Sequence, residues 1–228
     1  MLRDLLDAWR GRDLLGRMSI DFQEMLRKTD WMFAAVSDVL LGKRALDEVR
    51  DELYRTDGEV NQAEREIRRN ILHNLIMRPN PDVAASLVFM SVVKDAERVG
   101  DYCKNIFEVT AHYTMVGDDT PQVVVLKEFR ARVASLIART CAAFIAGDEA
   151  EAMRIVSDAE ALAAACDELI AGLYRDDLPA RKAVAYVLLA RYFKRIASHL
   201  RNIASAVMGA VEDLDYPHGP NQSRLKGL

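Results

Sequence analysis

The segment AERVGDYCKNI at residues 96–106 decides the fold, because it recurs as FKRIASHLRNI at residues 193–203. At a constant offset of 97, five positions keep the same or a closely similar residue: Arg98 and Arg195, Val99 and Ile196, Lys104 and Arg201, Asn105 and Asn202, and Ile106 and Ile203. Two positions differ, since Glu97 and Asp101 of the first copy correspond to Lys194 and Ser198 of the second. We infer a duplicated helical unit in which only the first copy keeps a pair of acidic groups.

Length and composition set the size of the core and the class of partner. The chain has 228 residues, half of them hydrophobic, so it can bury one large core or two cores of about 100 residues each. The duplication favours two cores. The formal net charge of -4 argues against a protein that works mainly by neutralising phosphate backbones. We therefore expect no nucleic-acid partner.

Cysteine usage and the N-terminal sequence both predict a cytoplasmic protein. Cys103, Cys141 and Cys166 have no C-x-x-C spacing and lie in apolar helical patterns, which is typical of small buried hydrophobes in a reducing compartment. Residues 1–16 alternate leucine with charged residues and lack the apolar run of a signal peptide. No window approaches the length of a membrane span, so we expect contact with a membrane only through a partner.

Long stretches with apolar residues at three- and four-residue steps predict amphipathic helices separated by glycine and proline turns. The expected helices cover residues 20–41, 44–77, 81 to about 110, 123–146, 149–174 and 180 to about 212. The clearest boundary between them is the turn cluster Gly117-Asp118-Asp119-Thr120-Pro121.

Each half of the chain therefore follows the order helix, glycine turn, helix, proline turn, helix. Three amphipathic helices joined by short turns pack as an antiparallel bundle. The predicted fold is all-α, with two tandem antiparallel three-helix bundles related by internal duplication. The expected organisation is an N-terminal arm at 1–16, a first bundle at 17–116, a second bundle at 121–212 and a flexible tail at 213–228.

The acidic residues of the first half have the spacing of a metal site. Glu97 and Asp101 are four residues apart, so both carboxylates project from one face of a helix. Asp57 and Asn61 repeat this spacing on the preceding helix, and Glu64 extends that row. In an antiparallel pair the two rows can meet and supply several oxygen ligands to a hard or borderline cation.

The alternative interpretation is a solvated face in which Glu97 pairs with Lys94 and Asp101 pairs with Lys104 or Lys94. Gly100 favours the metal-site interpretation. A glycine inside a helix lowers helix stability by about 0.8–1 kcal/mol relative to alanine. Such a glycine between two acids suggests that a metal, a water or a neighbouring backbone needs close access there.

Other sites find little support in the sequence. The four histidines, His73, His112, His199 and His218, are scattered and form no E-x-x-H or H-E-x-x-H motif, and His73 and His112 are expected on helix surfaces. No P-loop, G-x-G-x-x-G or G-x-S-x-G motif is present, and no nucleophile is paired with a base. We therefore expect no enzyme and no catalytic residue.

The run Glu97-Arg98-Val99-Gly100-Asp101, followed by Asn105-Ile106 and preceded by a long helix with Asp57, Asn61 and Glu64, resembles the signature of the PhoU family. The resemblance covers about residues 17–212. It implies tandem three-helix bundles that regulate phosphate uptake and signalling in bacteria. It also implies surface motifs of the E/D-x-x-x-D type that bind metal ions, in some members iron or zinc clusters.

The family's metal motif carries over only to the first bundle, onto Glu97, Asp101, Asp57 and Asn61. In the second bundle Lys194 and Ser198 replace both acids, and an ammonium group repels a cation. The resemblance therefore implies at most one divalent or iron-type metal ion.

The resemblance favours a cytosolic, non-enzymatic adaptor that restrains phosphate transport or phosphate-dependent signalling by binding a transporter or a sensor kinase. Two alternatives stay open. One is a carboxylate-cluster metalloprotein that stores metal or hydrolyses a phosphoester. The other is a helical structural or oligomerisation module, and a homodimer fits any of the three.

Overall fold

The computed structural model describes residues 13–77, 79 and 83–208. The C-terminal tail, most of the N-terminal arm, most of the turn at 78–81 and the expected helix end near residue 212 lie outside the described residues.

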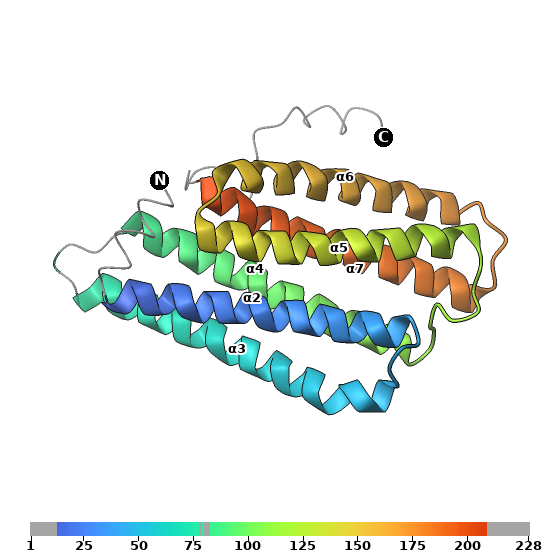
Figure 1. Cartoon of the computed structure of the whole chain (residues 1–228), viewed down its shortest axis with the longest axis horizontal. Coiled ribbons are helices and arrows are strands. Elements are labelled where there is room, and N and C mark those ends of the chain that lie inside the picture. The colour runs from blue at the N-terminus through green and yellow to red at the C-terminus, as the bar shows by residue number, and fades with distance from the viewer. Residues whose placement is uncertain (1–12, 78, 80–82, 209–228) are drawn as a thin grey trace.

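Six α-helices, with no strand, build the described part of the chain, which confirms the all-α prediction (Figure 1). Their bounds are α2 Asp13–Leu40, α3 Leu46–Met77, α4 Val83–Thr110, α5 Pro121–Ala146, α6 Glu149–Leu173 and α7 Ala180–Met208. No helix in the described ranges is long and apolar enough to cross a membrane.

The expected glycine turns end helices where the sequence placed them. Gly147 ends α5 with a φ of 62°, a left-handed conformation that favours glycine, and its N–H donates to the carbonyls of Ala143 and Phe144. Asp148 then caps α6, because its side chain accepts the N–H of Glu151 at 3.0 Å. Two residues thus reverse the chain. The largest difference from the prediction is the start of α2, which lies at Asp13 instead of residue 20. The added turns bury Met18 completely in the core.

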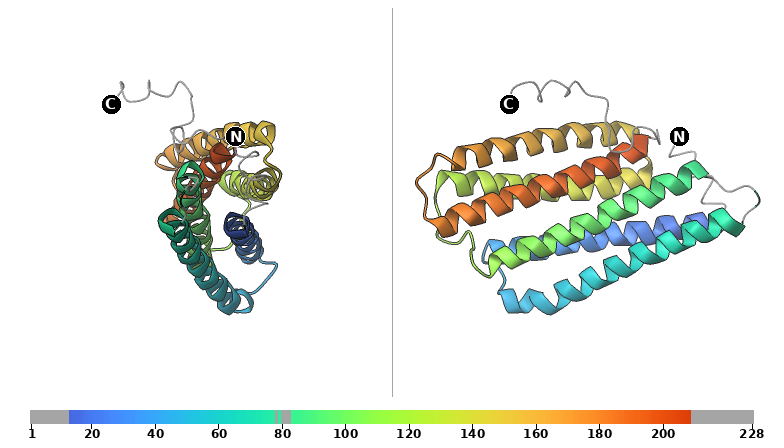
Figure 2. Two further views of the ribbon diagram at one scale, coloured as in Figure 1. Left: turned by 90° about the vertical axis from the view of Figure 1, so that its left-hand side faces the viewer. Right: turned by 180° about the vertical axis from the view of Figure 1, so that it is seen from behind.

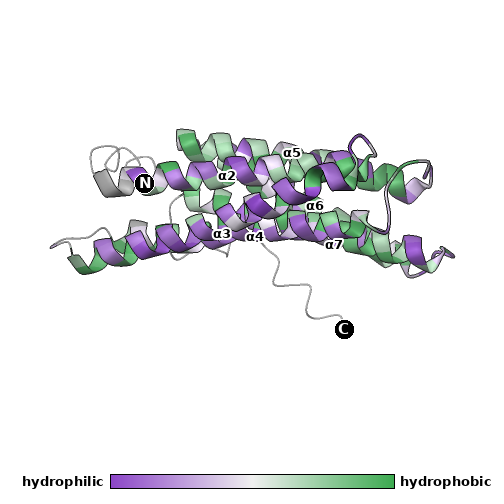
Figure 3. Ribbon diagram, turned by 90° about the horizontal axis from the view of Figure 1, so that it is seen from below, coloured by the Kyte–Doolittle hydropathy of each residue, from purple (hydrophilic) through white to green (hydrophobic). Residues whose placement is uncertain are grey.

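The helices form two layers. Seen end-on, α3, α4, α7 and α6 lie side by side in one curved layer, and α2 and α5 cover one side of it (Figure 2). α4 and α7 are the two inner helices of the larger layer, and they run antiparallel. The outer helix α3 is largely hydrophilic on its exposed side (Figure 3). The repeated segments of α4 and α7 therefore meet at the middle of the molecule.

One continuous core connects the two bundles. Phe22 of α2 packs against Phe144 of α5 with ring centroids 4.7 Å apart, and Phe33 of α2 lies 6.2 Å from Phe193 of α7. The buried apolar side chains of all six helices form a single cluster. The expectation of two separate cores is therefore wrong, because the inner helices are apolar on the side that faces the other bundle as well as on the side that faces their own.

The predicted turn between the bundles is anchored to α7. Asp118, 5% exposed, accepts hydrogen bonds from the hydroxyls of Tyr186 at 2.5 Å and Tyr113 at 2.9 Å, and Lys182 lies 3.1 Å away. Burial by itself raises the pKa of Asp118, but these partners and the Thr120 N–H outweigh it and hold the pKa well below its usual range. A segment without an apolar run is thus fixed by one buried carboxylate.

Candidate functional site

The structure brings the five predicted metal-site residues together along the contact between α3 and α4. Asp57, Glu64 and Glu97 are each less than 9% exposed, while Asn61 and Asp101 are partly exposed. The acids do not meet at one point. They form two groups at successive levels of the helix pair, and a lysine bridges the helices at each level.

Lys104 bridges the first level. Its Nζ lies 2.9 Å from Asp57 Oδ2 on α3 and 3.4 Å from Asp101 Oδ1 on α4. Asn61 donates from Nδ2 to the same Asp57 oxygen at 3.3 Å. Burial by itself lowers the pKa of Lys104, but its hydrogen bonds and charge interactions with Asp57 and Asp101 raise the pKa overall. The lysine is charged at neutral pH and neutralises both carboxylates.

Lys94 bridges the second level. Its Nζ lies 2.8 Å from Glu97 Oε2 and 3.7 Å from Glu64 Oε1. Arg68 Nη1 approaches Glu64 Oε1 to 3.1 Å, and Arg98 Nη1 approaches Asp101 Oδ2 to 2.9 Å. Every acid of the predicted site therefore contacts a lysine or an arginine of the chain itself.

This arrangement does not fit a resident cation. A metal bound between Asp57 and Asp101, or between Glu64 and Glu97, would have to displace the bridging ammonium group that already neutralises them. In the part of the chain that the structure describes, no three or more His, Cys, Asp or Glu side chains form a group suited to a metal. The metal site stays a prediction from the sequence alone.

The alternative interpretation named two of these ion pairs, Lys94 with Glu97 and Lys104 with Asp101, and both form. It described the face as solvated, which is wrong for Glu97 because that residue is 8% exposed. The sequence analysis missed the cross-helix contacts of Lys104 with Asp57 and of Lys94 with Glu64. Only the register of α3 against α4 could have revealed them.

Gly100 does not open a path to the acids. A Cβ atom at this position would lie 3.6 Å from Met32 Sδ and 3.7 Å from Val60 Cγ1, both in the core. These are ordinary van der Waals distances, and the position points inward. The expectation that a metal or a water needs this glycine is therefore unsupported.

The second bundle repeats the ion pairs with the charges rearranged. At an offset of 103, Asp57 corresponds to Glu160 and Glu64 corresponds to Asp167. Lys194, in the place of Glu97, donates to both oxygens of Asp167 at 2.7 and 2.6 Å, and Arg201 lies 3.9 Å from Glu160. The lysine that replaces the acid of the repeat in this bundle thus joins α7 to α6.

A polar cluster that the sequence analysis missed lies between the two bundles. Asp95 of α4, 7% exposed, contacts Nδ1 of His199 at 2.7 Å and accepts the Asn202 amide at 3.1 Å, both from α7. Tyr102 stacks on the His199 ring at a centroid distance of 5.7 Å. Tyr102 and His199 are equivalent residues of the repeat, so the two copies of the segment meet at this stacked pair. The predicted surface histidines, His73 and His112, are exposed as expected.

Comparison with known proteins matches both bundles to one family. A family model described as PhoU domain matches residues 22–110 and 126–207. A Burkholderia protein named phosphate-specific transport system accessory protein PhoU homolog is 26% identical over 205 residues, which are 85% of this chain and 86% of the relative.

Two crystal structures share the fold. PhoU from Pseudomonas aeruginosa matches with a TM-score of 0.77 at 18% identity, over 86% of this chain and 96% of that one. The phosphate transport system regulatory protein PhoU from Streptococcus pneumoniae matches with a TM-score of 0.68 at 20% identity, over 86% of this chain and 95% of that one. Since the family model covers more than half of the sequence and recurs in each bundle, the chain belongs to the PhoU family.

Proposed function

We propose that this chain is a non-enzymatic regulator that restrains phosphate uptake, or signalling that responds to phosphate, by binding a transporter component or a sensor kinase. The observation that carries the proposal is the match of both bundles to the PhoU domain. The Burkholderia relative, named as an accessory protein of a phosphate-specific transport system, supports the same role. An accessory protein acts through its contacts, and we propose that these form in the cytoplasm.

The chemistry of the described residues supports a role without catalysis. The carboxylates between α3 and α4 are each held by a basic side chain, so none is free to act as a general base. Burial raises the pKa of the Cys103 thiol, and it raises the pKa of the Cys166 thiol to about 12. Both thiols are protonated at neutral pH and are poor nucleophiles. We therefore expect no phosphoester hydrolysis above background.

Affinity purification from cells of the organism that encodes this chain tests the proposal. The tagged chain, cross-linked in phosphate-replete cells, is expected to recover a phosphate-transporter subunit or a sensor kinase. Deleting the gene is expected to change phosphate uptake or the expression of phosphate-starvation genes. Recovery of neither partner, together with unchanged uptake and expression, would overturn the proposal.

A further inference from the structure

The two equivalent inner helices differ sharply in charge. α4 carries three basic residues, Lys94, Arg98 and Lys104, and four acidic residues, Asp95, Glu97, Asp101 and Glu108. α7 carries six basic residues and no acid; the six are Arg181, Lys182, Arg191, Lys194, Arg195 and Arg201. In a chain with a net charge of -4, α7 thus carries an excess of positive charge.

Two of these basic residues are exposed and have no ionic partner in the described part of the chain. Lys194 and Arg201 approach acids of α6, Lys182 approaches Asp118, and Arg181 donates to the His112 carbonyl. Arg191 and Arg195 are exposed, and neither forms an ion pair with any residue that the structure describes. Two acids of the neighbouring helices are already engaged, because Asp167 binds Lys194 and Asp101 binds Arg98 and Lys104.

These two arginines continue an apolar row on the same face of the helix. Val184, Leu188, Arg191 and Arg195 are spaced by four, three and four residues, so they form one stripe along α7. Val184 is 59% exposed, although it is a large apolar side chain. We call these four residues the α7 stripe. Its first half is apolar and its second half is basic.

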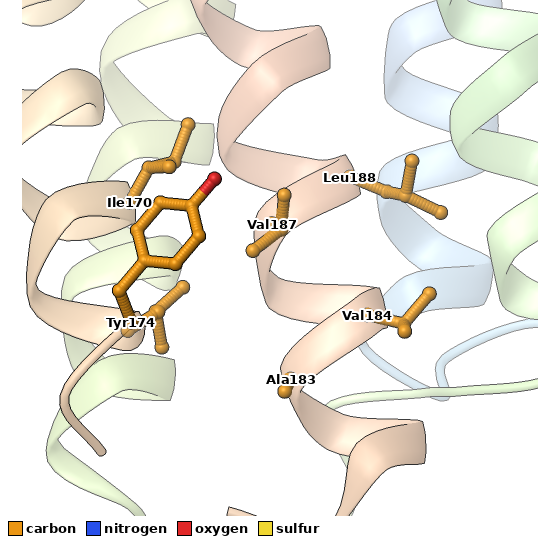
Figure 4. Close-up of a pocket in the computed structure, with 7 residues that line it drawn as sticks. Ile170, Tyr174, Ala183, Val184, Val187 and Leu188 are labelled. Atoms are coloured by element: carbon orange, nitrogen blue, oxygen red, sulfur yellow. The ribbon is translucent and has the colours of Figure 1, made fainter.

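The apolar half of the α7 stripe separates two hollows. The first, about 370 Å³, lies between α6 and α7 and is lined by residues that include Ile170, Tyr174 and Val187. The second, about 310 Å³, lies between α4 and α7 and includes Val109 and Tyr113. Val184 and Leu188 line both hollows. Figure 4 shows Ile170 of α6 and Tyr174, at the end of that helix, facing α7, with Val184 and Leu188 on the far side of α7.

The two copies differ on the aromatic side of this opening, although Leu87, the equivalent of Val184, is also exposed. Ile67 and Ile71 of α3 correspond, at the offset of 103, to Ile170 of α6 and to Tyr174, which caps the C-terminal end of α6. The first pair is fully buried, whereas Tyr174 is 88% exposed. An exposed aromatic beside apolar hollows is typical of a protein contact surface, because such side chains gain most when a partner removes them from water.

We propose that the α7 stripe and its two hollows bind an acidic amphipathic helix of a partner protein, with apolar side chains in the hollows and carboxylates against Arg191 and Arg195. A helix that lies in a groove places anchors at three- and four-residue steps, which is the spacing of the stripe itself. Unpaired arginines select acidic partners because guanidinium and carboxylate groups form paired hydrogen bonds. The inference deepens the proposed function by naming the contact surface.

Two synthetic helical peptides of about 18 residues test the surface on the full chain. Both carry the same leucine anchors in one half, and the other half carries glutamates in one peptide and lysines in the other. Fluorescence anisotropy is expected to show at least about tenfold tighter binding of the glutamate peptide, and added salt should reduce that preference. Val184→Glu should weaken both peptides, and Arg191→Glu/Arg195→Glu should abolish or reverse the preference.

Matched variants on the first bundle serve as controls. Arg65→Glu/Arg69→Glu makes the same charge change at the same spacing on exposed positions of α3, and Leu87→Glu changes the residue equivalent to Val184. Both should leave peptide binding within about twofold of the wild type. Circular dichroism and thermal melts of all variants confirm that each is folded.

Three results of the binding assays would overturn the inference, and a copurification result would do so as well. The first is equal binding of the two peptides to the wild type. The second is equal loss in the α3 control variants. The third is a combination of two observations: neither peptide binds, and the chain binds phosphatidylcholine vesicles that contain about 30% phosphatidylserine. If this vesicle binding requires Arg191 and Arg195, the face contacts lipid instead of a protein helix. If a transporter subunit copurifies equally with Arg191→Glu/Arg195→Glu and wild type, the surface is wrong and the proposed function stands. If the glutamate peptide binds as expected but no phosphate transporter or sensor kinase copurifies, the surface stands and the proposed function is wrong.

Discussion

The two inner helices, α4 and α7, descend from one repeated segment and use their charges in opposite ways. In α4 the basic residues turn toward acids on the same helix and on α3, and the exposed surface is largely neutralised. In α7 the acids have been replaced, so Lys194 reaches α6 while Arg191 and Arg195 stay unpaired among the described residues. The apolar positions that build the shared core agree between the copies, and so do the positions of Arg98, Lys104 and Asn105, but the acidic positions do not. The core thus sets the fold, while the surface of each copy is free to take a different role.

The largest expected effect comes from the residue that ties the two copies together. Asp118→Ala removes a buried carboxylate that accepts hydrogen bonds from Tyr113 and Tyr186, and we expect a loss of about 3 kcal/mol in the free energy of unfolding. Urea denaturation followed by circular dichroism measures it. Asp119→Ala, at the neighbouring exposed position, is the control and should change stability by less than about 0.5 kcal/mol.

The contribution of Asp118 depends on pH in a defined direction. Because the folded-state pKa lies below the unfolded value of about 3.9, the carboxylate stabilises the fold above that pH. This stability is lost as the pH falls below about 4 toward the folded pKa. The difference between wild type and Asp118→Ala should therefore be full at pH 7 and shrink in acid. A difference that grows below pH 4 would contradict the charged, hydrogen-bonded state of Asp118.

A second comparison sets the bridging lysine of the first bundle against its counterpart in the second. Lys104→Met leaves the buried Asp57 without its ammonium partner and should cost about 1.5 kcal/mol. Arg201→Met should cost less than about 0.5 kcal/mol, because its contact to the half-exposed Glu160 is 3.9 Å long. Both are measured by urea denaturation. Equal losses would mean that the two copies hold their outer helices with the same strength.

A smaller effect, of opposite sign, comes from giving the first copy a residue of the second. Gly100→Ala introduces the alanine found at position 197, and its Cβ would meet Met32 and Val60 at ordinary contact distances. The helix should gain about 0.5–1 kcal/mol, seen as a higher melting temperature. Gly58→Ala, mid-helix with open space, should gain a similar amount. Gly42→Ala should instead destabilise, since Gly42 has a φ of +71°. A destabilised Gly100→Ala would show that the position needs a glycine.

The sequence predicted the fold well because helix periodicity and turn residues are local signals. Gly147 ended α5 and the 117–121 cluster separates α4 from α5 as expected, and the offset of 97 revealed the duplication. The shared core was missed because periodicity gives the apolar face of a helix and not the helix that covers it. The same limit applies to the site. Spacing placed Glu97 and Asp101 on one face, but only the register between helices brings Lys104 to Asp57. The basic half of the α7 stripe could not be predicted from the sequence, because the exposure and the ion pairs of each arginine depend on the packing of the helices.

The smallest expected effect tests whether the acidic row of α4 needs a cation from outside the chain. Glu97→Lys gives the first copy the residue of the second, and the new ammonium group can approach Glu64 as Lys194 approaches Asp167. Stability should change by less than about 1 kcal/mol, because one ion pair replaces another. Metal analysis of protein purified without chelator should give equal iron and zinc contents for wild type and variant, well below one ion per chain. One ion per chain in the wild type that is lost in Glu97→Lys would place a metal on Glu97, and Lys94 and Lys104 would then have to leave these carboxylates when the metal binds. Melting curves with and without chelator separate the two cases, since a metal that bridges α3 and α4 would raise the melting temperature of the wild type alone.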